Sequence, residues 1–225
     1  MTSLPLVVLD MAGTTVADEG LVESAFSRAA AELGTPPGSP EHAGMLDHVR
    51  ATMGESKIVV FRALFGTEER ARQANAAFER AYADLVDSGA CKPLPGAEDA
   101  IRELRAQGRK VALTTGFSRT TQDAILAALG WQDIADLTLC PADAGRGRPY
   151  PDMVLTALLR TGTASVRDIA VAGDTAYDMI SGIRAGAPVV AGVLTGAHPE
   201  AGLRAAGATH ILASIAELPA LLGGL

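Results

Sequence analysis

The residues best suited to chemistry follow the apolar runs of the sequence instead of lying inside them. The segment 10–15 (Asp-Met-Ala-Gly-Thr-Thr) follows the first run, 114–116 (Thr-Thr-Gly) ends another, and 173–175 (Gly-Asp-Thr) ends a third, with Asp178 close behind. If these runs are neighbouring parallel strands, their polar residues meet beyond the carboxyl ends of the strands, where open sheets bind ligands.

This combination suits the transfer of a phosphoryl group. Asp10 and Asp174 offer carboxylate oxygens, which Mg²⁺ takes as ligands together with a substrate phosphate. Gly13 and Gly116 have no side chain to keep backbone amides away from an anion. Arg148, just before a helix-like stretch, adds donors for phosphate oxygens.

Each of these residues also has an ordinary structural explanation when it is taken alone. A strand-end aspartate such as Asp10 is usually a turn or cap residue, and Asp174 and Asp178 could serve the N-terminus of a helix that starts after Thr175. Arg148 could be a surface arginine. All of these parts in one order, each near an expected strand end, are hard to obtain by accident, and this favours a shared site.

Apolar runs alternate with helical patterns over most of the chain, and this alternation predicts the fold class. We expect buried strands at 5–9, 110–114, 134–140, 168–172, 188–193 and 210–212. Apolar residues recur at helical spacing between them. Continuous apolar strands that alternate with helices indicate an α/β fold with a Rossmann-like parallel sheet, covered on both faces.

One long segment lacks a convincing strand. Between about residues 19 and 89, four stretches have a helical pattern, at 21–33, 42–53, 57–64 and 68–86. We therefore expect an α-helical cap domain at 17–90, inserted into a core domain formed by 1–16 and 91–225.

Composition and net charge exclude several classes of binding partner. The 225 residues carry a net charge of −7, which argues against non-specific binding to nucleic acid or to anionic membranes. No apolar run approaches the roughly 20 residues of a membrane span. Cys91 and Cys140 are too few for a disulfide framework and fit free thiols in a reducing compartment. We expect a cytoplasmic protein that acts on a small molecule.

The order of the motifs resembles the haloacid dehalogenase (HAD) superfamily of phosphotransferases, from Leu6 to about Ile211. The superfamily normally has a second aspartate, a proton donor, where this chain has Ala12. That variant is similar to the phosphonatase (phosphonoacetaldehyde hydrolase) branch, as are the segments 114–119, 147–151 and 173–179. In the insert, the segment from Met53 and Gly54 to Lys57 resembles the part of the phosphonatase cap that carries an imine-forming lysine.

The resemblance implies a role for each matched residue. Asp10 would be the nucleophile that attacks phosphorus, and Lys57 would enter from the cap. The resemblance implies that Asp10, the Ala12 carbonyl and Asp174 bind Mg²⁺ and that Asp178 orients its water shell. It also implies that the phosphoryl group is bound by Gly13, Thr14, Thr115, Gly116 and Arg148. Phosphonatases pair through their caps, so the resemblance leaves open a monomer or a cap-mediated homodimer.

Ala12 and Lys57 together fit the cleavage of a P–C bond. A phosphate ester leaves as an alkoxide and benefits from a general acid, which Ala12 cannot be. A phosphonate leaves as a carbanion and needs an electron sink, which an imine between a lysine and a neighbouring aldehyde provides. Arginine could not do this, because its guanidinium does not deprotonate. Only three of the 19 basic residues are lysines, which favours a functional role for Lys57 over a solvated one.

Three positions depart from the phosphonatase pattern and leave the exact substrate open. Leu21, Val60 and Phe117 stand where that branch has a cysteine, a histidine and a tyrosine. One alternative is therefore a phosphate monoesterase of the phosphoglycolate phosphatase type, in which Lys57 binds an anionic group and the substrate assists the proton transfer. A non-catalytic binding protein on the same fold is a second alternative, against which the intact Asp10, Asp174 and Arg148 argue.

Overall fold

The computed structural model describes residues 4–225 and is built around a six-stranded parallel sheet with the order β3-β2-β1-β4-β5-β6. The strands are β1 (Leu6–Asp10), β2 (Lys110–Thr114), β3 (Leu137–Leu139), β4 (Ile169–Gly173), β5 (Val189–Val193) and β6 (His210–Leu212). Every expected strand is present, and the largest difference in bounds is at β3, which is shorter than the expected 134–140. The α/β class is confirmed.

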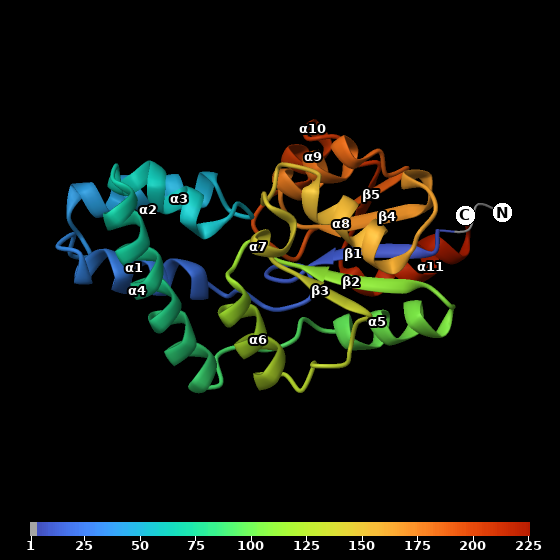
Figure 1. Ribbon diagram of the computed structural model, residues 1–225, viewed down its shortest axis with the longest axis horizontal. Coiled ribbons are helices and arrows are strands. Elements are labelled where there is room, and N and C mark those ends of the chain that lie inside the picture. The colour runs from blue at the N-terminus through green and yellow to red at the C-terminus, as the bar shows by residue number, and fades with distance from the viewer. Residues whose placement is uncertain (1–3) are drawn as a thin grey trace.

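Helices cover both faces of the sheet, which explains why its strands are continuously apolar. Leu6 and Val8 of β1 pack in one buried cluster, and Val7 and Leu9 pack in another on the opposite face. On the first face lie α8 (Asp152–Thr161), α9 (Ala176–Ala185) and α10 (Glu200–Ala205); on the second lie α5 (Ala97–Ala106) and α11 (Leu218–Gly223) (Figure 1). The remaining elements of this part are α6 (Arg119–Ala128), α7 (Pro141–Ala144) and the short 3₁₀ helices η1 (Val166–Asp168) and η2 (Ile215–Glu217).

Four helices stand apart from the sheet, beyond the carboxyl ends of its strands (Figure 1). They are α1 (Leu21–Glu32), α2 (Pro40–Ala51), α3 (Lys57–Phe65) and α4 (Glu68–Asp87), and they match the four expected helical stretches. Hydroxyl caps fix the starts of two of them, because Ser39 accepts from the His42 amide in α2 and Thr67 from the Arg70 amide in α4.

Aromatic side chains hold this helical group together and join it to the sheet. The Phe61 ring lies 5.9 Å from the Phe26 ring and 5.7 Å from the Phe78 ring, centroid to centroid. Phe117, which follows β2, lies 4.8 Å from Tyr82 of α4. One buried cluster therefore runs from the sheet into the helical group. The division into a core at 1–16 and 91–225 and a cap at 17–90 stays a prediction.

Strand register brings the chemically interesting residues to one level. Asp10 pairs with Thr114 across β1 and β2, and Leu9 pairs with Ala172 across β1 and β4. Asp174, two residues after Ala172, therefore emerges beside Asp10. The arrowheads of β1 and β2 point toward the helical group, and the C-terminus lies at the far end of the molecule (Figure 1).

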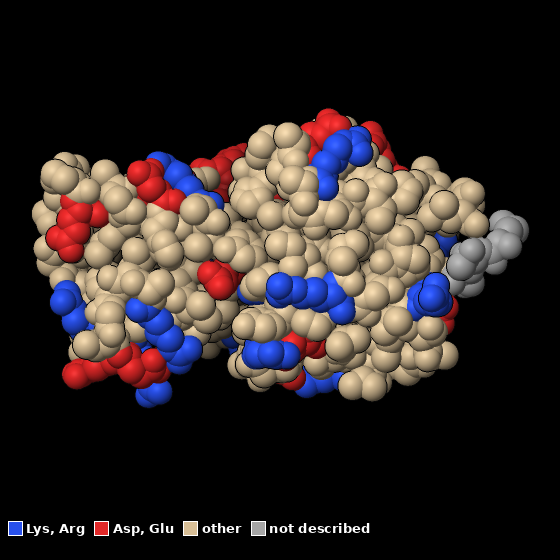
Figure 2. All heavy atoms as spheres, turned by 90° about the horizontal axis from the view of Figure 1, so that it is seen from above, with Lys and Arg blue, Asp and Glu red and all other residues tan. Residues whose placement is uncertain are grey.

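Neither the helices of the described residues nor the face seen in Figure 2 suggests a membrane or a strongly charged partner. Within residues 4–225, no helix is both long enough and apolar enough to cross a bilayer. On the face seen in Figure 2, acidic and basic side chains are intermixed in small groups over the helical group and the sheet domain alike. Cys91 and Cys140 are free thiols, as expected, and both are buried.

Candidate active site

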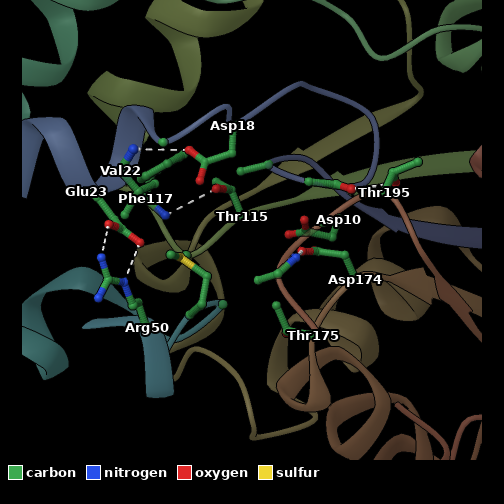
Figure 3. Close-up of a pocket in the computed structure, with 18 of the residues that line it drawn as sticks. Asp10, Asp18, Val22, Glu23, Arg50, Thr115, Phe117, Asp174, Thr175 and Thr195 are labelled. Carbon is green, nitrogen blue, oxygen red and sulfur yellow. Dashed lines mark hydrogen bonds and ion pairs between the residues drawn. The ribbon is translucent and has the colours of Figure 1, made fainter. Parts of the chain in front are cut away.

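A cavity of about 440 Å³ lies between the carboxyl ends of the strands and the helical group (Figure 3). Eight of the expected site residues line it together: Asp10, Ala12, Gly13, Lys57, Thr115, Gly116, Arg148 and Asp174. Thr14 and Asp178 lie directly behind this wall, where Thr14 contacts Asp174 and Asp178 contacts Arg148. The structure thus brings residues separated by more than 160 positions to a single pocket.

Arg148 is the central charged contact at the strand ends. Its guanidinium places Nη2 at 2.7 Å from Asp10 Oδ1 and Nε at 2.9 Å from Asp178 Oδ1, and Nη2 also donates to Thr114 Oγ1 at 3.0 Å. Although burial lowers the pKa of Arg148, the facing carboxylates of Asp10 and Asp178 outweigh it and raise that pKa. Arg148 therefore fixes the orientation of the Asp10 carboxylate.

Asp178 caps a helix and also contacts Arg148. It forms a capping box with Thr175 at the start of α9, where Asp178 Oδ2 accepts from the Thr175 amide at 3.1 Å and Thr175 Oγ1 accepts from the Asp178 amide at 3.3 Å. Its other oxygen, Oδ1, faces Arg148. Both oxygens are thus occupied by protein groups, so the ordinary capping role and the site role coexist in one residue.

Asp174 sits in a cradle made by two loops. Its Oδ1 accepts from Thr14 Oγ1 at 3.2 Å, and its Oδ2 accepts from the Ala197 amide at 2.7 Å. A Cβ atom at Gly13 or Gly196 would overlap the Asp174 carboxylate. Gly13 also has a φ of +86°, which favours glycine. These two glycines let the chain close around the carboxylate.

The carboxylates of Asp10 and Asp174 repel each other, and a bound cation would reduce this repulsion. Burial raises the pKa of Asp10 to about 7, against the opposing effect of Arg148. Burial and then the charge of Asp10 raise the pKa of Asp174 well above its ordinary value. Over the described residues, no group of three His, Cys, Asp or Glu side chains forms a complete metal cage. Two carboxylates and a main-chain carbonyl fit Mg²⁺, which takes few protein ligands and keeps several waters.

The Thr115-Gly116 turn faces this carboxylate pair. Thr115 Oγ1 accepts from the Phe117 amide at 3.2 Å, which leaves the hydroxyl proton free to donate to a bound anion. A Cβ atom at Gly116 would lie 2.6 Å from the Glu55 carbonyl oxygen, and the Lys57 amide donates to the Gly116 carbonyl at 3.2 Å. Glycine at 116 therefore allows the start of α3 to approach the strand ends.

Lys57, the first residue of α3, is 9% exposed and lines the cavity. Its Nζ lies 5.3 Å from the centroid of the Phe117 ring, and among residues 4–225 it forms no ion pair shorter than 4 Å. Burial lowers the pKa of Lys57 to about 8, while the charges of Asp18 and Asp10 partly oppose this. At pH 7 about a tenth of such a lysine is neutral, against well under a thousandth for an ordinary one.

The three departures from the phosphonatase pattern occupy different places. Leu21 and Val60 are buried within the apolar cluster and do not line the cavity, whereas Phe117 does. Only the change at Phe117 therefore alters the wall that a ligand would touch. It replaces a hydroxyl near Lys57 with an apolar edge.

Sequence reasoning missed part of the cavity wall. Thr195, after β5, donates from Oγ1 to the Gly13 carbonyl at 2.7 Å, and the rule that sites gather at strand ends could have found it. Asp18, Glu23 and Arg50 also line the cavity (Figure 3). In the sequence, Glu23 looks like an ordinary acid in a first helical turn and Arg50 like a surface arginine, so no local signal marks them.

Fold and site together define an α/β enzyme with acidic and basic groups buried at the ends of parallel strands, under a helical cover. The haloacid dehalogenase-like hydrolase family model matches residues 4–186. The chain belongs to this family and is a hydrolase of the HAD superfamily.

Individual relatives agree with this assignment. A phosphonoacetaldehyde hydrolase of Bacteroides fragilis is 30% identical, over 99% of this chain and 97% of its own. A protein of Dickeya dadantii named "Probable phosphatase IndB" is 28% identical, over 95% of this chain and 91% of its own. The crystal structure of a hydrolase from Pseudomonas syringae covers 100% of this chain and 99% of its own with a TM-score of 0.84 and 23% identity, which supports the fold.

Proposed function

We propose that this hydrolase cleaves the P–C bond of a small phosphono-aldehyde, phosphonoacetaldehyde or a close relative, through an imine on Lys57 and a phosphoryl group carried by Asp10. The observation that carries the proposal is the environment of Lys57. A lysine with a lowered pKa borders the same cavity as the strand-end carboxylates, and Ala12 stands where a proton donor would serve ester hydrolysis.

The first step uses Lys57. Its neutral amine attacks the aldehyde carbon, and loss of water gives a protonated imine. Burial of Lys57 favours this step, because the lysine must be neutral to attack. The Phe117 ring beneath Nζ can then face the resulting cation.

The second step uses Asp10. Its carboxylate attacks phosphorus, the P–C bond breaks, and the electron pair of that bond moves into the imine to give an enamine. Protonation of the enamine carbon and hydrolysis of the imine release the aldehyde product and restore Lys57. Water then hydrolyses the phosphoryl group from Asp10 to give inorganic phosphate.

The remaining residues bind and orient. Arg148 holds the Asp10 carboxylate through its 2.7 Å contact and lies where the phosphoryl oxygens would gather, with Thr115 and the Gly116 turn as further donors. Asp10, Asp174 and the Ala12 carbonyl would hold Mg²⁺, which neutralises phosphoryl charge when bound. Asp178 would act through Arg148 and through the position of the α9 terminus.

A phosphate monoesterase is the second candidate. The Dickeya dadantii relative is named a phosphatase, and with a pKa of about 8 most of Lys57 is cationic at neutral pH. In that case Lys57 would bind an anionic part of the substrate and form no covalent bond to it. We further propose that the enzyme is cytoplasmic, as a monomer or a homodimer that pairs through its helical cover.

Trapping with borohydride separates the two functions. Borohydride reduces an imine to a stable secondary amine, so phosphonoacetaldehyde plus borohydride should inactivate the enzyme and leave an adduct that mass spectrometry locates on Lys57. Lys92, which is exposed, is the internal control and should stay unlabelled. Inactivation without a Lys57 adduct, together with rapid release of phosphate from small esters, would favour the monoesterase.

A further inference from the structure

An ion pair forms the wall of the cavity on the side away from the strand-end carboxylates. Glu23 lies in the first turn of α1, and Arg50 lies in the last turn of α2. Arg50 Nε donates to Glu23 Oε1 at 2.9 Å and Arg50 Nη2 donates to Glu23 Oε2 at 2.8 Å. In Figure 3 this two-point contact lies on one side of the pocket, with Asp10 and Asp174 on the other.

Glu23 occupies the side of the Arg50 guanidinium that could otherwise bind a carboxylate at two points. A guanidinium that meets a carboxylate at two points is a favourable receptor for planar anions, and an arginine in a cavity wall would offer this to a substrate. Here Glu23 occupies two donor nitrogens of Arg50, and Asp47 takes the third, Nη1, at 3.3 Å. Three of the five N–H groups of Arg50 are therefore engaged by Glu23 and Asp47, and its charge is balanced within the protein.

The charge around the pair points the same way. Five carboxylates and three cationic side chains line the cavity. Asp18 accepts from the Val22 amide at the start of α1, close to Glu23, and Glu19 also lines the cavity. Lys57 must lose its charge to form an imine. The charge of a phosphoryl group bound at the strand ends is thus balanced there by Arg148. A second anionic group on the substrate, on the side of Glu23, would meet net negative charge.

We propose that Glu23 is a specificity-determining residue, which neutralises Arg50 and thereby restricts the cavity to substrates with one anionic group, the phosphoryl, and an uncharged remainder such as an aldehyde. The inference rests on the proposed function for the identity of the bound group. The inference goes beyond the proposed function because it excludes substrates with a carboxylate beside the phosphorus group. It assigns that exclusion to the ion pair between Glu23 and Arg50.

Two small ligands that differ by one carboxylate test the idea without turnover. Methylphosphonate carries the phosphonate alone, and phosphonoacetate adds a carboxylate. Their affinities are measured by isothermal titration calorimetry in the presence of Mg²⁺ for the wild type, E23Q, E19Q and the double variant E23Q/R50Q. Glu19 is the matched control, because it lines the same cavity, and across residues 4–225 it has no ion-pair partner.

The wild type should bind phosphonoacetate no more tightly than methylphosphonate. E23Q should tighten phosphonoacetate binding about fivefold, the scale of one partly exposed ion pair, and leave methylphosphonate within twofold. E19Q removes the same charge without releasing Arg50 and should leave both affinities within twofold. In E23Q/R50Q the gain should disappear.

Three results would overturn the proposal. An equal gain in E19Q and E23Q would mean that net charge alone matters, and no gain in E23Q would mean that Arg50 does not reach the ligand. A wild type that already prefers phosphonoacetate would show that the cavity accepts a second anion. Since no step of this experiment needs catalysis, its outcome is independent of borohydride trapping at Lys57, which tests the proposed function.

Discussion

The two ends of the cavity treat charge in opposite ways. At the strand ends, Asp10, Arg148 and Asp178 form a buried chain of ion pairs with contacts of 2.7 and 2.9 Å. At the cover, Lys57 is equally hidden but faces an aromatic ring and no close carboxylate among the described residues. At the strand ends the buried charges are paired, whereas Lys57 has no ion-pair partner among residues 4–225.

This difference matches two kinds of chemistry. A nucleophilic carboxylate must be ionised and fixed in direction; Arg148 fixes the direction of Asp10 and opposes the rise that burial causes in the pKa of Asp10. An amine that forms an imine must lose its proton, and removal of water and partners favours the neutral form. Similar burial therefore has different consequences at Asp10 and at Lys57. The presence or absence of a close counter-charge accounts for the difference.

The strand end is tested most strongly at Asp10. Asp10→Asn removes the proposed nucleophile and should lower turnover by about 10⁴-fold or more, while the hydrogen bond from Arg148 can persist. Phosphate release under saturating substrate measures the loss, and circular dichroism confirms that the fold is retained. A variant with near-wild-type rate would exclude Asp10 as the nucleophile.

The helical side of the cavity is tested by Lys57→Arg, which keeps a cation and removes the amine that we propose forms the imine. Hydrolysis of phosphonoacetaldehyde should fall by about 10³-fold or more, because no electron sink remains. If the enzyme is a monoesterase instead, KM for a phosphate ester should rise while kcat is largely spared. Steady-state kinetics on both substrates distinguishes these patterns, and substantial phosphonate turnover by Lys57→Arg contradicts the imine route.

A third change probes the Mg²⁺ site that we propose at Asp10 and Asp174. Asp174→Asn keeps an oxygen that can accept from the Ala197 amide but removes a negative charge from the pair. The Mg²⁺ concentration for half-maximal activity should rise about 100-fold. An unchanged Mg²⁺ titration would place the metal away from Asp174.

The smallest expected effect concerns stability. The pKa of Lys57 is about 8 in the folded state and about 10.4 in the unfolded chain, so below pH 8 the charged lysine costs about 3 kcal/mol of stability. Lys57→Met should therefore raise the free energy of unfolding, fully below pH 8 and progressively less as the pH rises toward 10.5.

Urea denaturation at pH 7 and pH 10 measures this trend. Lys92→Met, at an exposed lysine, is the control and should change stability little. A destabilised Lys57→Met would show that Lys57 contributes favourable contacts that outweigh its burial.

Much of the strand end could be predicted from the sequence, because a parallel sheet converts local order into spatial proximity. An aspartate at the end of an apolar run, such as Asp10 or Asp174, reaches the same edge as its neighbours whatever the intervening loops do. Lys57 was found differently, from the resemblance of its segment to the phosphonatase cap and from the scarcity of lysine.

The ion pair between Glu23 and Arg50 could not be predicted in this way. It depends on the angle at which α1 and α2 meet, and helix packing is set by side chains distributed over both helices. The dual contacts of Asp178 were equally hidden, since the sequence offered a helix cap and a site role as alternatives, and the structure combines them.

The aromatic junction of Phe117 with Tyr82, at 4.8 Å, has a consequence for how the molecule unfolds. Two modules with separate apolar interiors would melt independently, whereas here one continuous buried cluster spans the sheet and the four helices. We expect a single calorimetric transition whose van't Hoff and calorimetric enthalpies agree. Loss of this junction, as in Phe117→Ala, would uncouple the helices and split that transition into two.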